Sequence, residues 1–166
     1  MLQFTIYLYI QMLFIQMKIE ELLKTKDTMS PSKKLALNLM VTANHISDRV
    51  QEAIKPFGIS SQQFNVLRIL RGQNGKPANL STIQERMVSK MSNTTRLVDK
   101  LVEKELCERI VCPSNRRKIE IRITSKGLQL LKELDPIIEN VENSFSNKLN
   151  KNEIELLNIK LNELRS

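Results

Sequence analysis

Apolar residues recur every three to four positions along most of this chain, which is the spacing of amphipathic helices. One such stripe begins at Leu35, and another follows Ser60, which can form a capping box with Gln63. Two short strand-like segments, residues 107–112 and 119–124, interrupt the helical spacing. We therefore predict a mainly α protein with a small β-hairpin, and helices over residues 35–54, 60–71, 80–88, 92–106, 124–145 and 150–164.

The stretch from Leu80 to Lys126 has the order of elements typical of a winged helix-turn-helix. A short helix, a tight turn at 89–91 and a second helix over 92–106 come first. A strand, a basic turn at 113–118 and a returning strand follow directly and form the wing. We take residues 60–126 as the DNA-binding core on this basis.

The second helix of the motif has one apolar face and one face suited to contacts with bases. Its apolar stripe, which should face a core, consists of Leu97, Val98, Leu101, Val102 and Leu106. On the other face, an asparagine amide can pair with adenine, an arginine with guanine, and a threonine methyl group can touch thymine. An ordinary amphipathic helix is the alternative for this segment alone, and the adjoining wing makes it the less favoured one. The predicted base-contacting residues are Ser92, Asn93, Thr95, Arg96 and Lys100.

Positive charge is concentrated on the same motif. Residues 64–126 contain 14 Lys and Arg against 6 Asp and Glu, and the rest of the chain contains 12 of each, so the whole net charge of +8 lies in this stretch. Concentrated positive charge attracts the phosphate backbone of nucleic acid, which favours double-stranded DNA as the partner. The sequence shows no phosphate loop, nucleophile motif or metal cluster, so we expect neither an enzyme nor a cofactor.

The segments Arg96–Leu101, Glu108-Arg109, Asn115–Arg117 and Ile123–Gly127 together resemble the MarR family of winged-helix transcription regulators. The resemblance extends from about Ser32 to Leu164. It implies a domain over residues 32–166, preceded by an N-terminal extension over 1–31, and a homodimer that acts on a pseudo-palindromic operator, most often as a repressor. Release from DNA by a small aromatic ligand is implied in the same way. A reduced cytoplasmic setting fits the two cysteines, which do not make a disulfide framework.

The two ends of the resembling region supply the expected dimer contacts, and the wing supplies further DNA contacts. Apolar stripes on the helices at about 32–55 and 125–165 would be stranded in a lone domain, so we expect them to join two copies. Winged-helix geometry places Asn115 and Arg117 beside an adjacent minor groove, where a guanidinium is favoured. The predicted phosphate contacts are Arg71, Lys90, Arg116 and Lys118.

Two positions depart from the family pattern. Glu105 stands where a glycine usually follows the second helix, so the helix must end without the residue best suited to a left-handed conformation. Asn115 stands where an aspartate usually precedes the two wing arginines. It keeps the hydrogen-bonding capacity but not the charge that would orient Arg117, so the wing geometry is less sharply specified.

The first 17 residues carry no charged side chain and allow three interpretations. We favour translated upstream sequence, with Met17 or Met29 as the natural start. An extra helix covering apolar surface in the dimer and a membrane anchor are the others, although a spanning helix needs about 20 apolar residues. The anchor leads to the alternative function, a membrane-tethered module that uses its winged helix to bind protein.

The two cysteines, Cys107 and Cys112, bracket one predicted strand at an odd separation and should point to opposite faces. An internal disulfide is therefore not expected, and we interpret them as small apolar residues, with a thiol redox switch as the alternative. His45 is the single histidine and cannot build a zinc site alone.

Overall fold

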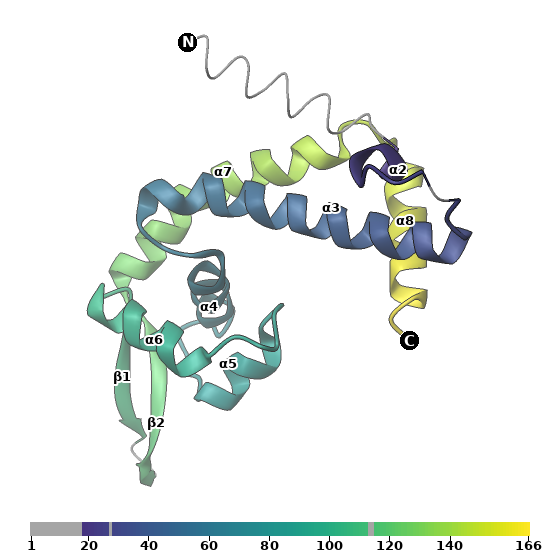
Figure 1. The fold of residues 1–166 in the computed structure, drawn as a ribbon. Coiled ribbons are helices and arrows are strands. Elements are labelled where there is room, and N and C mark those ends of the chain that lie inside the picture. The colour runs from purple at the N-terminus through teal and green to yellow at the C-terminus, as the bar shows by residue number, and fades with distance from the viewer. Residues whose placement is uncertain (1–17, 27, 113–114) are drawn as a thin grey trace. The chain divides into compact units, whose positions relative to one another are not determined.

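The computed structural model describes residues 18–26, 28–112 and 115–166, and the side chains of residues 112–118 fall outside this description (Figure 1). The chain divides into two units, Met1–Ile46 and Ser47–Ser166. The three interpretations of the N-terminal 17 residues fall on positions outside the described part of the chain. The proposed boundary of the family-like domain at residue 32 stays a prediction.

The first unit contains the short helix α2 (Ile19–Leu22) and the first part of α3 (Pro31–Ile54), which continues into the second unit. Lys34 Nζ on α3 lies 2.7 Å from Glu20 Oε1 on α2. The hydrogen bond from Lys34 lowers the pKa of the Glu20 carboxyl below its ordinary value. The long helix predicted from the apolar stripe is confirmed and begins four residues before Leu35.

The second unit has the element order of a winged helix-turn-helix, which confirms the predicted fold class (Figure 1). Within the described residues its β-structure is one antiparallel hairpin and one isolated bridge. The elements after α3 are η1 (Lys55–Phe57), α4 (Ser61–Arg71), α5 (Leu80–Arg86), α6 (Thr94–Glu103), β1 (Cys107–Cys112), β2 (Asn115–Ile123), α7 (Ser125–Ser146) and α8 (Lys151–Glu163).

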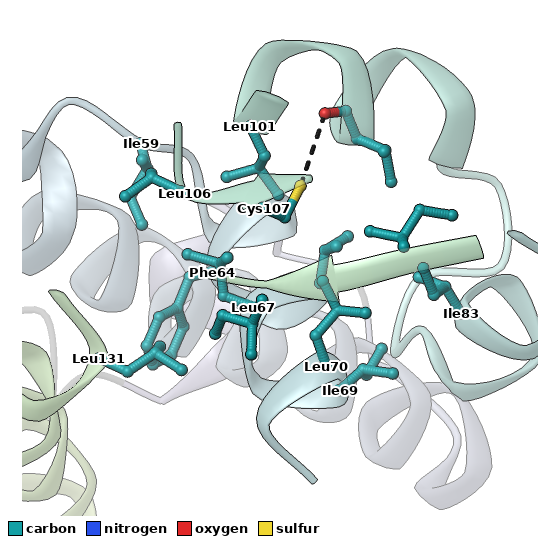
Figure 2. Packing of buried hydrophobic residues seen from close by; sticks show 14 of the residues in the cluster. Ile59, Phe64, Leu67, Ile69, Leu70, Ile83, Leu101, Leu106, Cys107 and Leu131 are labelled. Carbon is teal, nitrogen blue, oxygen red and sulfur yellow. Dashed lines mark hydrogen bonds between the residues drawn. The ribbon is translucent and has the colours of Figure 1, made fainter. Parts of the chain in front are cut away.

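The core of this unit brings together one face of each element of the motif (Figure 2). Leu67 and Leu70 of α4 lie at its centre with Ile83 of α5, Leu101 of α6 and Leu131 of α7, and each is at most 1% exposed. Burying one such leucine or isoleucine side chain contributes about 1.5–3 kcal/mol to folding. The same residue pattern that predicted the helices therefore also holds the second helix of the motif against the rest of the unit.

Side chains cap the helices where the sequence indicated. Ser60 Oγ accepts a hydrogen bond from the N–H of Gln63, and the Gln63 side chain accepts one from the N–H of Ser60, which completes the predicted capping box of α4. Thr124 caps α7, and Asn150 forms a second capping box with Glu153 at the start of α8. Each cap satisfies backbone N–H groups that would otherwise lack a partner at a helix start.

The hairpin differs from the predicted one in the length of its second strand. β1 has the predicted bounds, whereas β2 starts at Asn115 rather than at residue 119. The strands pair from Cys107 opposite Ile123 to Cys112 opposite Asn115, with an irregularity at the last step. Ala78, before α5, adds a bridge to this sheet: its N–H donates to Ile121 O at 2.9 Å, and Ile121 N–H donates back at 2.7 Å. The sheet therefore reaches the start of the helix-turn-helix.

Both helices of the motif are shorter than predicted. α5 ends two residues early because Met87 has extended backbone, with ψ 136°, and buries its side chain. α6 does not fill the predicted range 92–106, because the Asn93 side chain caps its start and the chain leaves it at Glu105, whose φ is 60°. Glu105 therefore adopts the left-handed conformation although it is not the glycine best suited to it.

We expect Glu105→Gly to raise the free energy of unfolding by about 0.5–1 kcal/mol, because a φ of 60° is unfavourable for a residue with a Cβ. The change also removes an exposed ion pair, Glu105 Oε2 to Lys126 Nζ at 2.8 Å, which contributes little. Glu105→Ala is the matched control, since it removes the ion pair and keeps the strained backbone. Urea denaturation at equal protein concentrations checks this, and a Gly variant no more stable than the Ala variant would contradict it.

Candidate nucleic-acid interface

Helix α6 turns one face to the core and the other to solvent. Thr94, Val98 and Leu101 are buried, as the apolar stripe predicted for the last two. The structure brings the predicted base-contacting residues together at the start and along the outer face of this helix: Asn93, Thr95, Arg96 and Lys100 are exposed, and Ser92 is half-buried. The helix therefore presents a short, polar and cationic surface on a rigid support.

Asn93 has a structural role that the sequence analysis did not assign to it. Its Oδ1 accepts a hydrogen bond from the backbone N–H of Arg96 at 3.1 Å. A cap of this kind is worth about 1 kcal/mol, so replacing Asn93 would weaken the helix as well as any base contact. Pairing with adenine would use the same oxygen as an acceptor. Arg96, with its exposed side chain, gives the cleaner test of base contact.

Hydrogen bonds from neighbouring helices fix the turn between α5 and α6. Val88 N–H donates to Asn65 Oδ1 on α4 at 3.0 Å, and Gln84 Nε2 on α5 donates to Lys90 O at 2.6 Å. Thr94 Oγ1, in the first turn of α6, hydrogen-bonds to the Gln84 side chain. The start of α6 is thereby tied to both preceding helices. Nothing in the periodicity of the sequence indicated these bonds, because Asn65 and Gln84 look like ordinary polar surface residues.

Two of the predicted phosphate contacts have partners within the protein. Lys90 is exposed, and its Nζ donates to the carbonyl of Glu85. Arg71 Nη1 lies 2.7 Å from Asp135 Oδ2 on α7. An ammonium group that donates to one carbonyl keeps two further N–H groups and its full charge. The arginine, in contrast, has its charge offset locally by a carboxylate.

An ion pair between Asp99 and Arg109 joins α6 to the wing. The Arg109 guanidinium pairs with the Asp99 carboxylate across the junction of α6 and β1. Both side chains are about 40% exposed (43% and 38%), so the pair adds little to stability. It does offset a negative charge on the outer face of α6 that would otherwise repel phosphate. The two residues are ten positions apart, and the sequence gave no signal that they would pair.

The wing residues predicted to contact DNA lie on β2. The backbone of Asn115, Arg116, Arg117 and Lys118 forms the first part of this strand rather than a turn. Their side chains are outside the described residues. The predicted minor-groove and phosphate contacts of these four residues therefore stay predictions.

Cys107 lies under α6, where its thiol is shielded (Figure 2). The residue is 2% exposed, and its Sγ donates to Val98 O at 3.9 Å. Burial raises the pKa of the thiol to about 11, and only the thiolate is a strong nucleophile. This environment agrees with the interpretation of Cys107 as a small apolar residue.

We therefore expect iodoacetamide at pH 8 to leave Cys107 unmodified in the folded protein and to modify it after unfolding in urea. The reason is that both access and ionisation are suppressed in the folded state. Mass spectrometry of the proteolytic peptide that contains Cys107 provides the measurement. Equal rates of modification in the two states would show that the thiol is accessible and would revive the redox-switch alternative.

A cleft of about 440 Å³ lies beside the end of α6. η1, the segment that follows α6 and the first half of α7 form its walls. Its lining combines apolar and charged side chains. The residues that line it are Phe57, Lys104, Leu106, Lys126, Gln129, Leu130 and Glu133.

In the described ranges, no helix is both long and apolar enough to span a membrane. The same part of the chain also holds no group of three or more His, Cys, Asp and Glu side chains placed to bind a metal ion.

Comparison with known proteins gives one consistent result. The model of the MarR family matches residues 59–119. The HTH-type transcriptional regulator MhqR of Bacillus subtilis (strain 168) is 32% identical over 105 residues, which are 63% of this chain and 71% of MhqR. A MarR transcription factor from Planctomyces limnophilus is 30% identical, with a TM-score of 0.63 over 83% of this chain and 99% of its own.

The fold also matches a DNA-bound structure. A mutant MarR from E. coli complexed with operator DNA superposes with a TM-score of 0.73, covering 84% of this chain and 99% of that one, at 18% identity. An identity this low demonstrates the shared fold alone.

Proposed function

Because this chain belongs to the MarR family of transcription regulators, we propose that it acts as a homodimeric repressor on a pseudo-palindromic DNA operator in the cytoplasm. The observation that carries the proposal is the outer face of α6. It holds exposed Thr95, Arg96 and Lys100 on a helix whose inner face is anchored in the core. Base contacts require a rigid element of this kind, since a loosely held side chain discriminates poorly between bases.

In the proposed complex, the two α6 helices enter successive major grooves whose centres lie about 34 Å apart. Arg96 and Lys100 would pair with guanine, Thr95 and Ser92 would contact base edges at closer range, and Asn93 would add to them with its amide nitrogen. The positive charge of residues 64–126 supports the docking, because this stretch contains 14 Lys and Arg and only 6 Asp and Glu.

The wing and the turn would supply the contacts that position the protein. Arg117 and Asn115 would reach a minor groove, and Lys90, Arg116 and Lys118 would bind phosphates. Arg71 would have to leave Asp135 to reach a phosphate, so we omit it from the proposed contacts.

The apolar stripes support the homodimer. Leu35 of α3 is 48% exposed, and Leu157 and Leu164, in α8 and directly after it, are 49% and 56% exposed. Large apolar side chains exposed in a row are costly in water, and a second copy of the same chain offers matching stripes. This arrangement would also place two α6 helices on one duplex, which a palindromic operator requires.

Light scattering at micromolar concentration should give twice the chain mass of 19.2 kDa. Deleting Asn150–Ser166 should produce monomer or aggregate, because it removes α8 and leaves its partner surface uncovered. A full-length protein that stays monomeric and well behaved would contradict the proposed assembly.

The cleft beside α6 supports regulation by a small aromatic ligand. Its volume of about 440 Å³ lies within the range of small-molecule sites. Phe57, Leu106 and Leu130 offer apolar surface for a ring, and Lys104 could bind an acidic or phenolic oxygen, whereas Lys126 would first have to leave Glu105. A ligand there would contact the end of the DNA-reading helix, so binding could shift its position. We propose this cleft as the ligand site.

Selection of bound duplexes from a random pool tests the function and returns the operator in one experiment. We expect enrichment of an inverted repeat whose half-site centres lie about one helical turn apart. Affinity for the enriched operator should fall steeply with salt. Failure to enrich any sequence, while the protein is folded and dimeric, would refute the proposal and favour a role in binding protein.

A further inference from the structure

Two apolar side chains in the turn before α6 are almost completely exposed. Met91 is 95% exposed and Val88 is 88% exposed. Among the other large apolar side chains of the described residues, the highest exposed fraction is 63%, at Met40. A turn needs no apolar side chain at its surface, and the other residues of this turn that face solvent are polar or charged. The pair is therefore unlike the rest of the surface.

Hydrogen bonds hold the backbone around this pair in the conformation that exposes both side chains. The N–H of Val88 is bound to Asn65 Oδ1 at 3.0 Å, and the carbonyl of Lys90 accepts from Gln84 Nε2 at 2.6 Å. Ser92 N–H closes the turn on Ser89 O at 3.3 Å. Burying Val88 or Met91 would require breaking these bonds. The exposure is thus a built feature of the turn.

The surroundings of the pair favour DNA over protein as its partner. Lys90 lies between the two residues in the sequence, and Arg96 extends from the first turn of α6. A stable protein interface needs a larger apolar centre from which charged residues are depleted. DNA suits both the cations and the apolar pair. Its phosphates attract the cations, and the C5-methyl group of thymine is an apolar contact in the major groove.

The position of the pair relative to α6 points to the same partner. Met91 lies two residues before Asn93, the residue that caps α6. In helix-turn-helix proteins, the N-terminal residues of the second helix contact base edges. A side chain at Met91 that projects fully into solvent would therefore enter the groove together with Arg96. The apolar pair is continuous with the proposed DNA-binding face.

We infer that Val88 and Met91 form a thymine-sensing surface, in which each apolar side chain contacts the methyl group of a thymine next to the bases met by α6. This inference rests on the proposed function and extends it, because it predicts thymines at defined positions of each half-site. It also explains why two highly exposed positions of this turn are apolar, although its other exposed residues are polar or charged.

Replacing thymine by uracil isolates the methyl group, since dU keeps every hydrogen-bonding atom of dT. The probes are operator duplexes from the random-pool selection. In each probe, dU replaces dT at one position, and the change is made in both half-sites. The wild-type protein should lose about fourfold in affinity for each methyl contact removed, the effect of one buried methyl-sized group. Changes of dT to dU outside the positions met by this turn and by Thr95 should have no effect.

The variant Val88→Asn/Met91→Gln places a polar amide at each position in a side chain of similar size and leaves no methyl group there. It should bind the dT and dU operators equally, whereas Met91→Leu and the turn control Ser89→Ala should keep the wild-type preference. Retention of the full dT preference by the double variant would overturn the inference, as would a wild-type operator without thymine in its half-sites or without any response to dU. Absence of any enriched operator would instead reject the proposed function, and the inference with it.

Discussion

Replacing Gly127 by alanine should destabilise the protein by about 3 kcal/mol or more. A Cβ at this position of α7 would lie 2.2 Å from Leu106 O and 2.8 Å from Ile123 Cγ1, far closer than atoms can approach. Leu106 O cannot withdraw freely, because it accepts the N–H of Thr124 at 3.2 Å. The start of α7 must therefore move away from Leu106 and Ile123 and lose both packing and a hydrogen bond.

Gly72→Ala is the matched control for this substitution. A Cβ there would lie 3.4 Å from its nearest neighbour, Ile69 O, and the φ of Gly72 is −65°, which any residue adopts. We expect its stability to equal or slightly exceed that of the wild type. Urea denaturation followed by circular dichroism compares the three proteins. A Gly127→Ala variant as stable as the control would show that α7 does not need its close approach to the hairpin.

Replacing Arg96 by alanine should cost about 1–3 kcal/mol in operator affinity and relax the base preference at one position of each half-site. The side chain is exposed on the first turn of α6, and its backbone N–H, which caps the helix through Asn93, is unchanged by the substitution. Fold and thermal stability should therefore stay nearly the same. Titration of the operator, of single-base variants and of a random duplex provides the measurement.

Lys90→Ala serves as the comparison, because a phosphate contact carries no sequence information. It should weaken binding to all duplexes alike and reduce the slope of log affinity against log salt by about one for each site. An Arg96→Ala variant that lost operator and random-duplex affinity equally would move Arg96 into the class of phosphate contacts. The two variants together separate the residues that position the protein from those that distinguish bases.

The sequence alone predicted features that depend on residues a few positions apart. The apolar stripe of α6, the capping box of Ser60 and Gln63, and the cap at Thr124 are all confirmed. Each involves side chains within one turn of a helix, so the local order of residues is enough to specify it. The end of the second helix at Glu105 without a glycine was also noted from the sequence, but the left-handed backbone that Glu105 adopts there is a finding of the structure.

The bounds of α5 and α6 were predicted too widely, and the reason lies outside each helix. Met87 lies after the end of α5 and buries its side chain in the core. Asn93 caps α6, whereas the pattern had placed it inside this helix. Met87 follows Ile83 at helical spacing, so the apolar pattern could not show that Met87 packs into the core from a turn rather than from α5.

Only the tertiary structure decided which polar residues are paired and which are exposed to a partner. Arg71 meets Asp135 from 64 positions away, and Val88 is held by Asn65 from 23 positions away. Such partners are chosen by the packing of whole elements, about which neighbouring residues carry no information. The sequence by itself thus determined the helix-turn-helix, its wing and their positive charge. The packing of α4 and α7 against that motif decided that Arg71 is held within the protein while Met91 projects from it.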